Sequence, residues 1–170
     1  HLALFRLESL DDVGVLRLVD AHMAGDALQV TLQRVDAAAM LWRLHLLGVP
    51  VGERATALVR QWDLADSSAG YYAFNDVHAL LVLLIAGEQA RAEHWVARCA
   101  EHAMAVGESH RSNHAMAREV GAPLMRALLA YCRGEADAAA DALYAVRGKA
   151  QRFGGSHAQR DVIDLTLIES

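Results

Sequence analysis

Residues 84–96 read LIAGEQARAEHWV, and their pattern of apolar residues, glycine and alanine indicates the fold class of the chain. An apolar helical pattern ends at Gly87, and a second helical pattern, rich in alanine, begins directly after it. Glycine is common just beyond the end of a helix because it adopts a positive φ at little cost. The stretch therefore predicts two helices joined by a tight turn, which together form an αα-hairpin.

Two further stretches repeat this junction. Gly48 lies in LLGVPVGERATAL, and Gly134 lies in YCRGEADAAADAL. The junctions are about 40 residues apart, rather than the strict 34 residues of a tetratricopeptide repeat (TPR). Small alanines allow paired helices to approach closely, and each hairpin hides its remaining apolar edge only by stacking on the next hairpin. We therefore predict an all-α fold, a TPR-like α-α hairpin superhelix (α-solenoid), in which residues 1–170 form a single helical-repeat domain.

The rest of the chain also favours helices. It contains only two prolines and no sustained alternation of apolar and polar residues, so it gives little sign of strands. Helices are expected over residues 2–10, 13–23, 28–47, 53–64, 75–86, 88–106, from beyond residue 113 to 133 with an interruption at 121–123, 136–151, and from 157 to the end. The side chains expected in the core include the stripe Ala92, Trp95, Val96, Cys99, Ala103 and Val106, together with Leu80, Leu81, Leu84, Trp42 and Trp62.

Composition narrows the class of function. The chain has 16 Lys and Arg against 21 Asp and Glu, a formal charge of -5, which argues against binding to a nucleic-acid backbone. Its longest apolar run, 79–86, is far shorter than the roughly 20 residues that span a membrane. Cys99 and Cys132 lie in apolar helical stretches, as small hydrophobes do in a reducing compartment. We expect a cytoplasmic protein without nucleic-acid or membrane partners and, because the apolar pattern is under way at Leu2, the C-terminal part of a longer protein.

Polar residues gather in GGSHAQRD, residues 154–161. Ser156 followed three residues later by Gln159 is a capping box, so a helix is expected to start there. The first turns of this helix carry His157, Arg160 and Asp161 beside backbone N–H groups that favour negative charge. If a ligand binds, an anionic or carboxylate-bearing one suits these groups.

The same residues also have a purely structural interpretation. His157 and Asp161 are four residues apart, so the carboxylate either orients the imidazole or merely complements the helix dipole. In the structural interpretation, Arg160 pairs with Asp164 and His157 only packs. Both interpretations stay open from the sequence.

A second polar motif is FNDVHA, residues 74–79. Asn75 and His78 are three residues apart and share a helix face, whereas Asp76 points elsewhere unless Asn75 or Asp76 caps the helix. Both polar motifs begin first helices of hairpins, which a solenoid places side by side along one concave wall. We therefore predict that Arg43, His45, Asn75, His78, His157 and Arg160 converge on one pocket or groove. The full set of predicted ligand-binding residues is Arg43, His45, Asn75, Asp76, His78, Ser156, His157, Gln159, Arg160 and Asp161.

No catalytic residue, metal site or cofactor is predicted. His110 and His114 have the four-residue spacing of a metal-binding pair, but no HExxH motif accompanies them, so solvated histidines are favoured. The chain has no GxSxG motif and no glycine-rich phosphate loop after a strand.

Five stretches together resemble the tetratricopeptide repeat protein 38 family. They are HLAL at 1–4, MLWRLHLLGVPVGER at 40–54, FNDVHALL at 74–81, REVGAPLMRALLAYCRG at 118–134 and, most distinctively, FGGSHAQRDV at 153–162. The resemblance implies an α-helical repeat protein, usually longer than this chain, and it implies a fold rather than a chemistry.

Three functions are compatible with these observations. The leading hypothesis is a non-enzymatic scaffold whose concave face holds a peptide, a partner helix or a small anionic ligand. The alternative is an enzyme or small-molecule sensor that uses a buried polar cluster formed by FNDVHA and GGSHAQRD. A regulatory module of a larger bacterial regulator ranks last. An open, long groove favours the scaffold, whereas an enclosed pocket with perturbed pKa values favours the alternative.

Overall fold

The chain folds as helices joined by turns and short loops. The computed structural model describes residues 1–170 apart from the side chain of residue 108, and this part of the chain contains no β-strand, which confirms the all-α prediction. The α-helices are α1 (Leu2–Glu8), α2 (Asp12–His22), α3 (Thr31–Leu46), α4 (Glu53–Val59), α5 (Ala73–Ile85), α6 (Gln89–Met104), α7 (Ser112–Met116), α8 (Ala122–Cys132), α9 (Ala136–Arg147), α10 (His157–Arg160) and α11 (Val162–Ile168). Short 3₁₀ segments are η1 (Gly25–Gln29), η2 (Asp66–Ser68), η3 (Val106–Glu108) and η5 (Ala150–Phe153), and η4 (Ala117–Gly121) is a π-helix. None of the described helices combines the length and the apolar character needed to cross a membrane.

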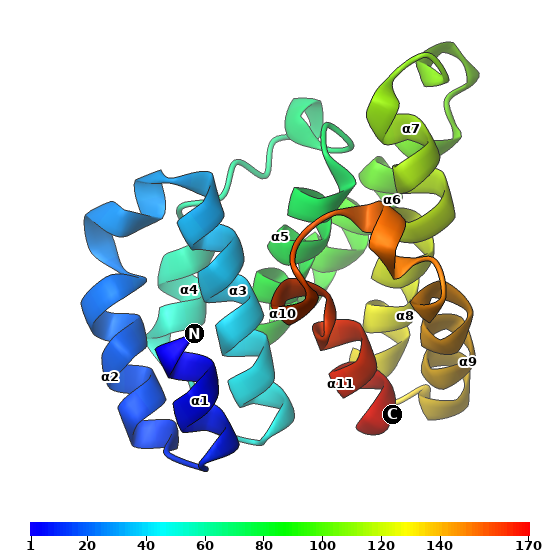
Figure 1. The fold of residues 1–170 in the computed structure, drawn as a ribbon. Helices are drawn as coiled ribbons and strands as arrows, with labels where there is room; N and C mark the ends of the chain where they lie inside the picture. Colours follow the sequence, from blue (N-terminus) through cyan, green and yellow to red (C-terminus); the bar gives the residue numbers. More distant parts are fainter.

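Neighbouring helices pack as antiparallel pairs. α1 packs with α2, α3 with α4, α5 with α6, and α8 with α9. The first helices of successive pairs also contact one another, α3 with α5 and α5 with α8, so the pairs lie side by side in chain order (Figure 1). The hairpins that the sequence predicts are therefore present.

The three predicted glycine junctions have the same backbone geometry. Gly48, Gly87 and Gly134 have φ values of 71°, 73° and 74°. In each junction the N–H after the glycine donates to a carbonyl five residues back: Val49 to Leu44 at 2.9 Å, Glu88 to Leu83 at 2.9 Å and Glu135 to Ala130 at 3.0 Å. A positive φ followed by this bond ends a helix and turns the chain sharply, so the tight turns are confirmed.

Several helices end earlier than their sequence pattern predicts. The expected helix 28–47 is divided at Val30, which is extended, and the expected helix 53–64 ends at Val59. The expected helix from residue 157 is interrupted at Asp161 and continues as α11. The interruption expected at 121–123 is instead a π-helical turn that runs into α8, with Pro123 in the first turn of α8.

The core confirms most of the predicted apolar positions. Trp42 and Trp95 are buried, as are Leu80, Leu81 and Leu84, whereas Trp62 is only half-buried. Two predictions are corrected. Val106 is exposed because α6 ends at Met104, so the helical stripe does not extend that far. Cys132, at the end of α8, is exposed, whereas Cys99 is buried as expected.

The C-terminal segment, residues 150–170, returns to the first half of the chain. α11 packs against both α9 and α3, and η5 packs against η4. Figure 1 shows α10 and α11, in red, lying between α3 and α9. The first hairpins and the last helices are therefore joined directly, and the candidate site lies along this junction.

Candidate functional site

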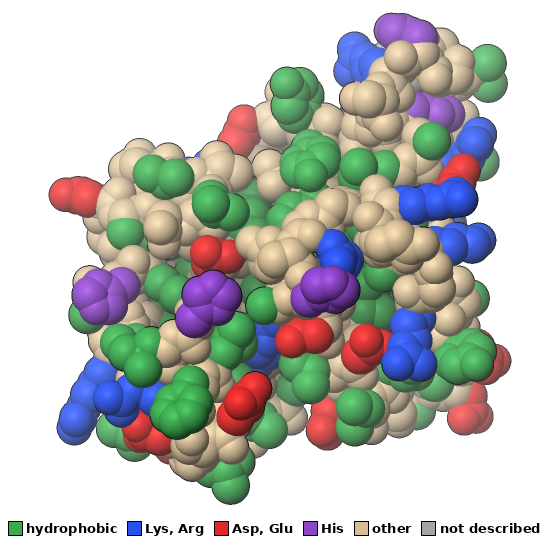
Figure 2. Space-filling view, viewed as in Figure 1, with side chains coloured by type: hydrophobic (Ala, Val, Ile, Leu, Met, Phe, Trp, Pro, Cys, Tyr) green, Lys and Arg blue, Asp and Glu red, His purple; other side chains and the backbone are tan. Residues whose placement is uncertain are grey.

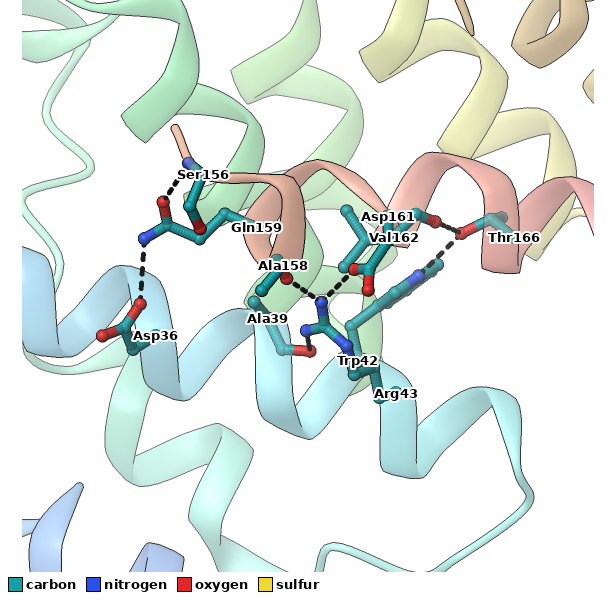
Figure 3. Close-up of polar contacts among 10 residues, drawn as sticks. All are labelled: Asp36, Ala39, Trp42, Arg43, Ser156, Ala158, Gln159, Asp161, Val162 and Thr166. Atoms are coloured by element: carbon teal, nitrogen blue, oxygen red, sulfur yellow. Dashed lines mark hydrogen bonds and ion pairs between the residues drawn. The ribbon is translucent and has the colours of Figure 1, made fainter. Parts of the chain in front are cut away.

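Arg43 of α3 is the central polar residue of this junction. Its side chain is buried, and its Nη1–H donates to the Ala39 carbonyl oxygen at 2.7 Å. Its Nη2–H groups donate to the Ala158 carbonyl oxygen and to the Asp161 carboxylate (Figure 3). Arg43 thus links α3 to α10 and to the start of α11. Its Nε is buried without a hydrogen-bond partner among the described residues.

The predicted capping box is present and makes a second link to α3. The Ser156 N–H donates to Gln159 Oε1 at 2.8 Å. The Nε2–H₂ group of the same glutamine donates to Asp36 Oδ1 on α3 at 2.9 Å (Figure 3). Gln159 therefore orients the start of α10 and attaches it to the neighbouring helix.

A third link was not predicted from the sequence. Trp42 Nε1–H donates to Thr166 Oγ1 at 2.9 Å, and the Thr166 hydroxyl donates to the Val162 carbonyl oxygen at 2.6 Å (Figure 3). Both side chains are fully buried. The only sequence signal was one threonine within the apolar run 162–168, because a buried hydroxyl needs a partner.

Residues of the first two links line a groove between α1 and the C-terminal segment. The groove consists of two adjacent pockets of about 240 and 380 Å³, both lined by Leu4 and Arg43. The first is also lined by Leu7, Glu8, Leu46, Leu47, Asp161, Leu165, Ile168 and Glu169. The second is also lined by His1, Ala3, Met23, Leu32, Asp36, Ala39, Met40, Ser156, Ala158 and Gln159.

The groove has apolar walls and an excess of negative charge. Its acidic lining residues are Glu8, Asp36, Asp161 and Glu169, against the single guanidinium of Arg43. Figure 2 shows acidic and apolar side chains together over α1 and α11. Such a lining favours a ligand that is apolar and basic over the anionic ligand expected from the sequence.

Asn75 and Asp76 lie in a different place, which we call the aromatic pocket. It has a volume of about 140 Å³ and is lined by Thr31, Arg34, Trp62, Asp63, Ser68, Tyr71, Tyr72, Asn75, Asp76 and Trp95. Burial raises the pKa of the Asp76 carboxyl group to about 7, and the smaller opposing influence of the nearby Gly70 backbone N–H does not offset it. The sequence predicted that Asn75 and Asp76 point in different directions, but both line this pocket.

His78 is a core residue. Its ring is fully buried, its Nδ1 lies 2.7 Å from the Phe74 carbonyl oxygen, and its ring centroid lies 4.4 Å from that of Phe74. Burial, with a smaller contribution from the charge of Arg43, lowers the pKa of His78 to about 4. A neutral ring must donate from Nδ1 to the carbonyl, which leaves Nε2 as a buried acceptor without a partner in the described structure.

The three remaining predicted residues line neither the groove nor the aromatic pocket. His45 is exposed at the end of α3, beside the Trp42 ring at 5.3 Å, and partial burial lowers its pKa. His157 is exposed on α10. Arg160 Nη1–H donates to the carbonyl oxygens of Gly154 and Gly155, so it holds the loop before α10 rather than pairing with Asp164.

The predicted meeting of the two motifs therefore takes a different form. FNDVHA and GGSHAQRD are in contact, because a Cβ added to Gly155 would lie 2.5 Å from Phe74 Cε2. Phe153, the residue directly before the second motif, also packs on Phe74, with the ring centroids 5.1 Å apart. The contact is packing of aromatic rings and glycine backbone. The polar side chains are divided between the groove, the aromatic pocket and the core, because successive positions of α5 face different neighbours.

Comparisons with known proteins give no assignment. No protein-family model matches the chain, and no solved structure matches it. Among the described residues there is no group of three or more His, Cys, Asp or Glu side chains that could hold a metal ion. His114 Nε2 lies 3.1 Å from the Ala105 carbonyl oxygen, which gives this histidine a structural partner.

Proposed function

We propose that the chain is a TPR-like helical-repeat scaffold, an α-solenoid related to the tetratricopeptide repeat protein 38 family, and that its groove binds an apolar, basic segment of a partner protein. The repeated hairpins with identical glycine turns support the repeat class. The free cysteines Cys99 and Cys132 support the cytoplasmic location that the sequence predicts.

The main support for the proposal is the groove itself. Its first pocket is walled by leucines from three helices, and Leu47 and Ile168 remain largely exposed at its edge. Apolar side chains that stay exposed around a concavity gain free energy when a partner covers them, at roughly 25 cal/mol per Å². Apolar side chains of one segment would fill the two pockets on either side of Arg43.

Charge defines the rest of the partner. Arg43 is already paired with Asp161, so it offers little free positive charge to an anion. Glu8 and Glu169 line the same pocket, and acidic groups around an apolar groove attract lysine and arginine side chains. We therefore expect the bound segment to carry basic residues next to its apolar ones.

Selection from a random peptide library displayed on phage tests this proposal. Selection on the wild-type protein should enrich sequences that combine apolar and basic residues. The double variant Leu47→Asn with Ile168→Asn removes apolar groove contacts at exposed positions, and we expect it to bind the enriched peptides at least tenfold more weakly. Fluorescence polarisation with the synthetic peptides measures this difference.

A matched variant provides the control. Met104 and Val106 are exposed apolar residues at the end of α6, away from the groove. The variant Met104→Asn with Val106→Asn should bind the peptides as the wild type does. Equal binding by both double variants, or the absence of enrichment, would contradict the proposal.

A further inference from the structure

The aromatic pocket is separate from the groove and has a different chemistry. Its lining residues belong to neither groove pocket, and they include four aromatic side chains: Trp62, Tyr71, Tyr72 and Trp95. Tyr71 is exposed at its edge, and Trp62 Nε1 is buried without a partner in the described structure. A cavity of about 140 Å³ accommodates a small group rather than a drug-sized molecule.

Asp76 places a carboxyl group in this pocket without a cationic partner. The residue is 4% exposed, and its side chain lines the aromatic pocket. No ion pair to Asp76 occurs among the described residues. A buried carboxylate is costly unless it is paired, so the ionised form of Asp76 is stabilised by a positive group that enters the pocket.

The other two charged residues of the pocket are bound locally. Arg34 donates to the Leu28 carbonyl oxygen at 2.8 Å and to Thr31 Oγ1 at 2.8 Å, and its guanidinium lies 5.6 Å from the Trp62 ring centroid. The Asp63 carboxylate accepts hydrogen bonds from the Ala65 N–H and the Ser68 hydroxyl. These two residues carry opposite charges, so the charge of Asp76 is the one left unbalanced.

We propose that the aromatic pocket binds an organic ammonium group, which pairs with the Asp76 carboxylate among the four aromatic side chains of the pocket. A carboxylate supplies the ion pair, and aromatic rings attract cations through their quadrupoles. Quaternary and methylated ammonium groups combine positive charge with apolar surface, so they suit a pocket walled by aromatic residues. A metal ion is disfavoured there, because hard cations prefer several carboxylate ligands and the described residues contain no group of three or more His, Cys, Asp or Glu side chains that could hold one.

Titration with tetramethylammonium and with uncharged tert-butanol tests this site. Two tryptophans line the pocket, so indole N–H signals in ¹H–¹⁵N NMR spectra report binding directly. Tetramethylammonium should shift the signals of Trp62 and Trp95 in a saturable manner, whereas tert-butanol should be at least tenfold weaker. Equal effects of the two probes would overturn the proposal, because they would show binding by shape alone.

Variants identify the residue that holds the cation. Asp76→Asn keeps the size of the side chain and should weaken tetramethylammonium binding at least tenfold, whereas Asp137→Asn, an exposed acidic position on α9, should bind as the wild type does. Tyr71→Leu removes the exposed aromatic ring at the edge of the pocket without destabilising the fold. It should weaken tetramethylammonium binding several-fold. Unchanged binding by Asp76→Asn, or loss in Asp137→Asn as well, would overturn the proposal.

Two sources of the ammonium group are distinguished by competition. A free quaternary ammonium compound is represented by choline, and a side chain is represented by a pentapeptide with a central trimethyllysine between glycines. Tighter binding of choline supports a small-molecule ligand, and tighter binding of the peptide supports a modified protein side chain. The groove variant Leu47→Asn with Ile168→Asn should retain this binding, which separates the result from the proposed peptide groove.

Discussion

Two buried residues of α5, Asp76 and His78, affect folding stability in opposite directions as the pH changes. Burial raises the pKa of Asp76 to about 7 from an ordinary value near 3.8, so between these pH values the folded chain keeps a proton that the unfolded chain releases. Folding stability from this group is lost as pH rises through that window. Burial lowers the pKa of His78 to about 4 from about 6.5, so its contribution is lost as pH falls through 6.5 toward 4. The two effects partly cancel.

In Asp76→Asn, the pH dependence of stability that comes from α5 should be that of His78 alone. The amide keeps the size of the side chain but cannot ionise, so only His78 then titrates in α5. Relative to the wild type, the variant should gain about 4 kcal/mol between pH 4 and pH 8, from a pKa difference of about three units at about 1.4 kcal/mol each. Urea denaturation followed by circular dichroism at several pH values measures this gain. Parallel pH profiles for the two proteins would refute the assignment.

Among the elements, α11 depends most on one specific hydrogen bond. Its apolar side packs on α3 and α9, and many sequences would satisfy that packing. The bond from Trp42 Nε1–H to Thr166 Oγ1 is specific, because it satisfies a buried donor that no water reaches. This bond selects the position of α11 along α3.

Thr166→Val should therefore destabilise the protein. Valine has nearly the same shape, but it leaves the Trp42 indole N–H buried without an acceptor, which costs about 1–3 kcal/mol. Thr56→Val, a half-buried threonine on α4, is the matched control and should change the free energy of unfolding by less than about 0.5 kcal/mol. Chemical denaturation compares the two variants, and similar effects would mean that the hydroxyl is not needed.

The elements also show how much was predictable from the sequence. The turns at Gly87 and Gly134 were predictable because a positive φ and a helix-ending hydrogen bond involve only a few neighbouring residues. The capping box at Ser156 was predictable for the same reason. The return of α11 to α3 was not, because residues 124 positions apart meet there through side-chain shape rather than through a local pattern.

The candidate site was predicted only in part. Arg43 and Asp161 do come together, but Arg43 otherwise donates to backbone carbonyls. Gln159 lies nearby and is bound to Asp36 and to the Ser156 N–H. Helical periodicity could not show that His78 is enclosed by the core, since both a core histidine and a ligand occupy the same kind of position. The apolar walls of the groove were missed because they come from α1, α3 and α11, which are distant in sequence.

In the molecule as a whole, Arg43 links α3 to the C-terminal segment. Arg43→Met removes the charged link between α3 and the C-terminal segment while keeping an apolar stem in place. We expect hydrogen exchange of the amides in residues 156–168 to accelerate about tenfold, with much smaller changes in α8 and α9. The half-exposed Asp161 carboxylate is hydrated in the variant, which limits the loss of stabilising free energy.

A surface arginine supplies the comparison. Arg98→Met removes ion pairs to Asp66 and Glu101 on the outside of α6, and it should leave exchange in residues 156–168 unchanged. Mass spectrometry of peptic peptides resolves these regions. Uniform acceleration along the chain in Arg43→Met would indicate a general loss of stability rather than release of the segment.

The contact between α3 and α11 also has a kinetic consequence. Arrays of stacked hairpins assemble mostly from contacts near in sequence, so each added unit closes only a short loop. Here the last helix reaches its place only after a loop of 124 residues has closed, which raises the contact order and delays completion of the native state. Joining the two ends in this way makes the protein slower to assemble, and its outer hairpins then no longer fray independently.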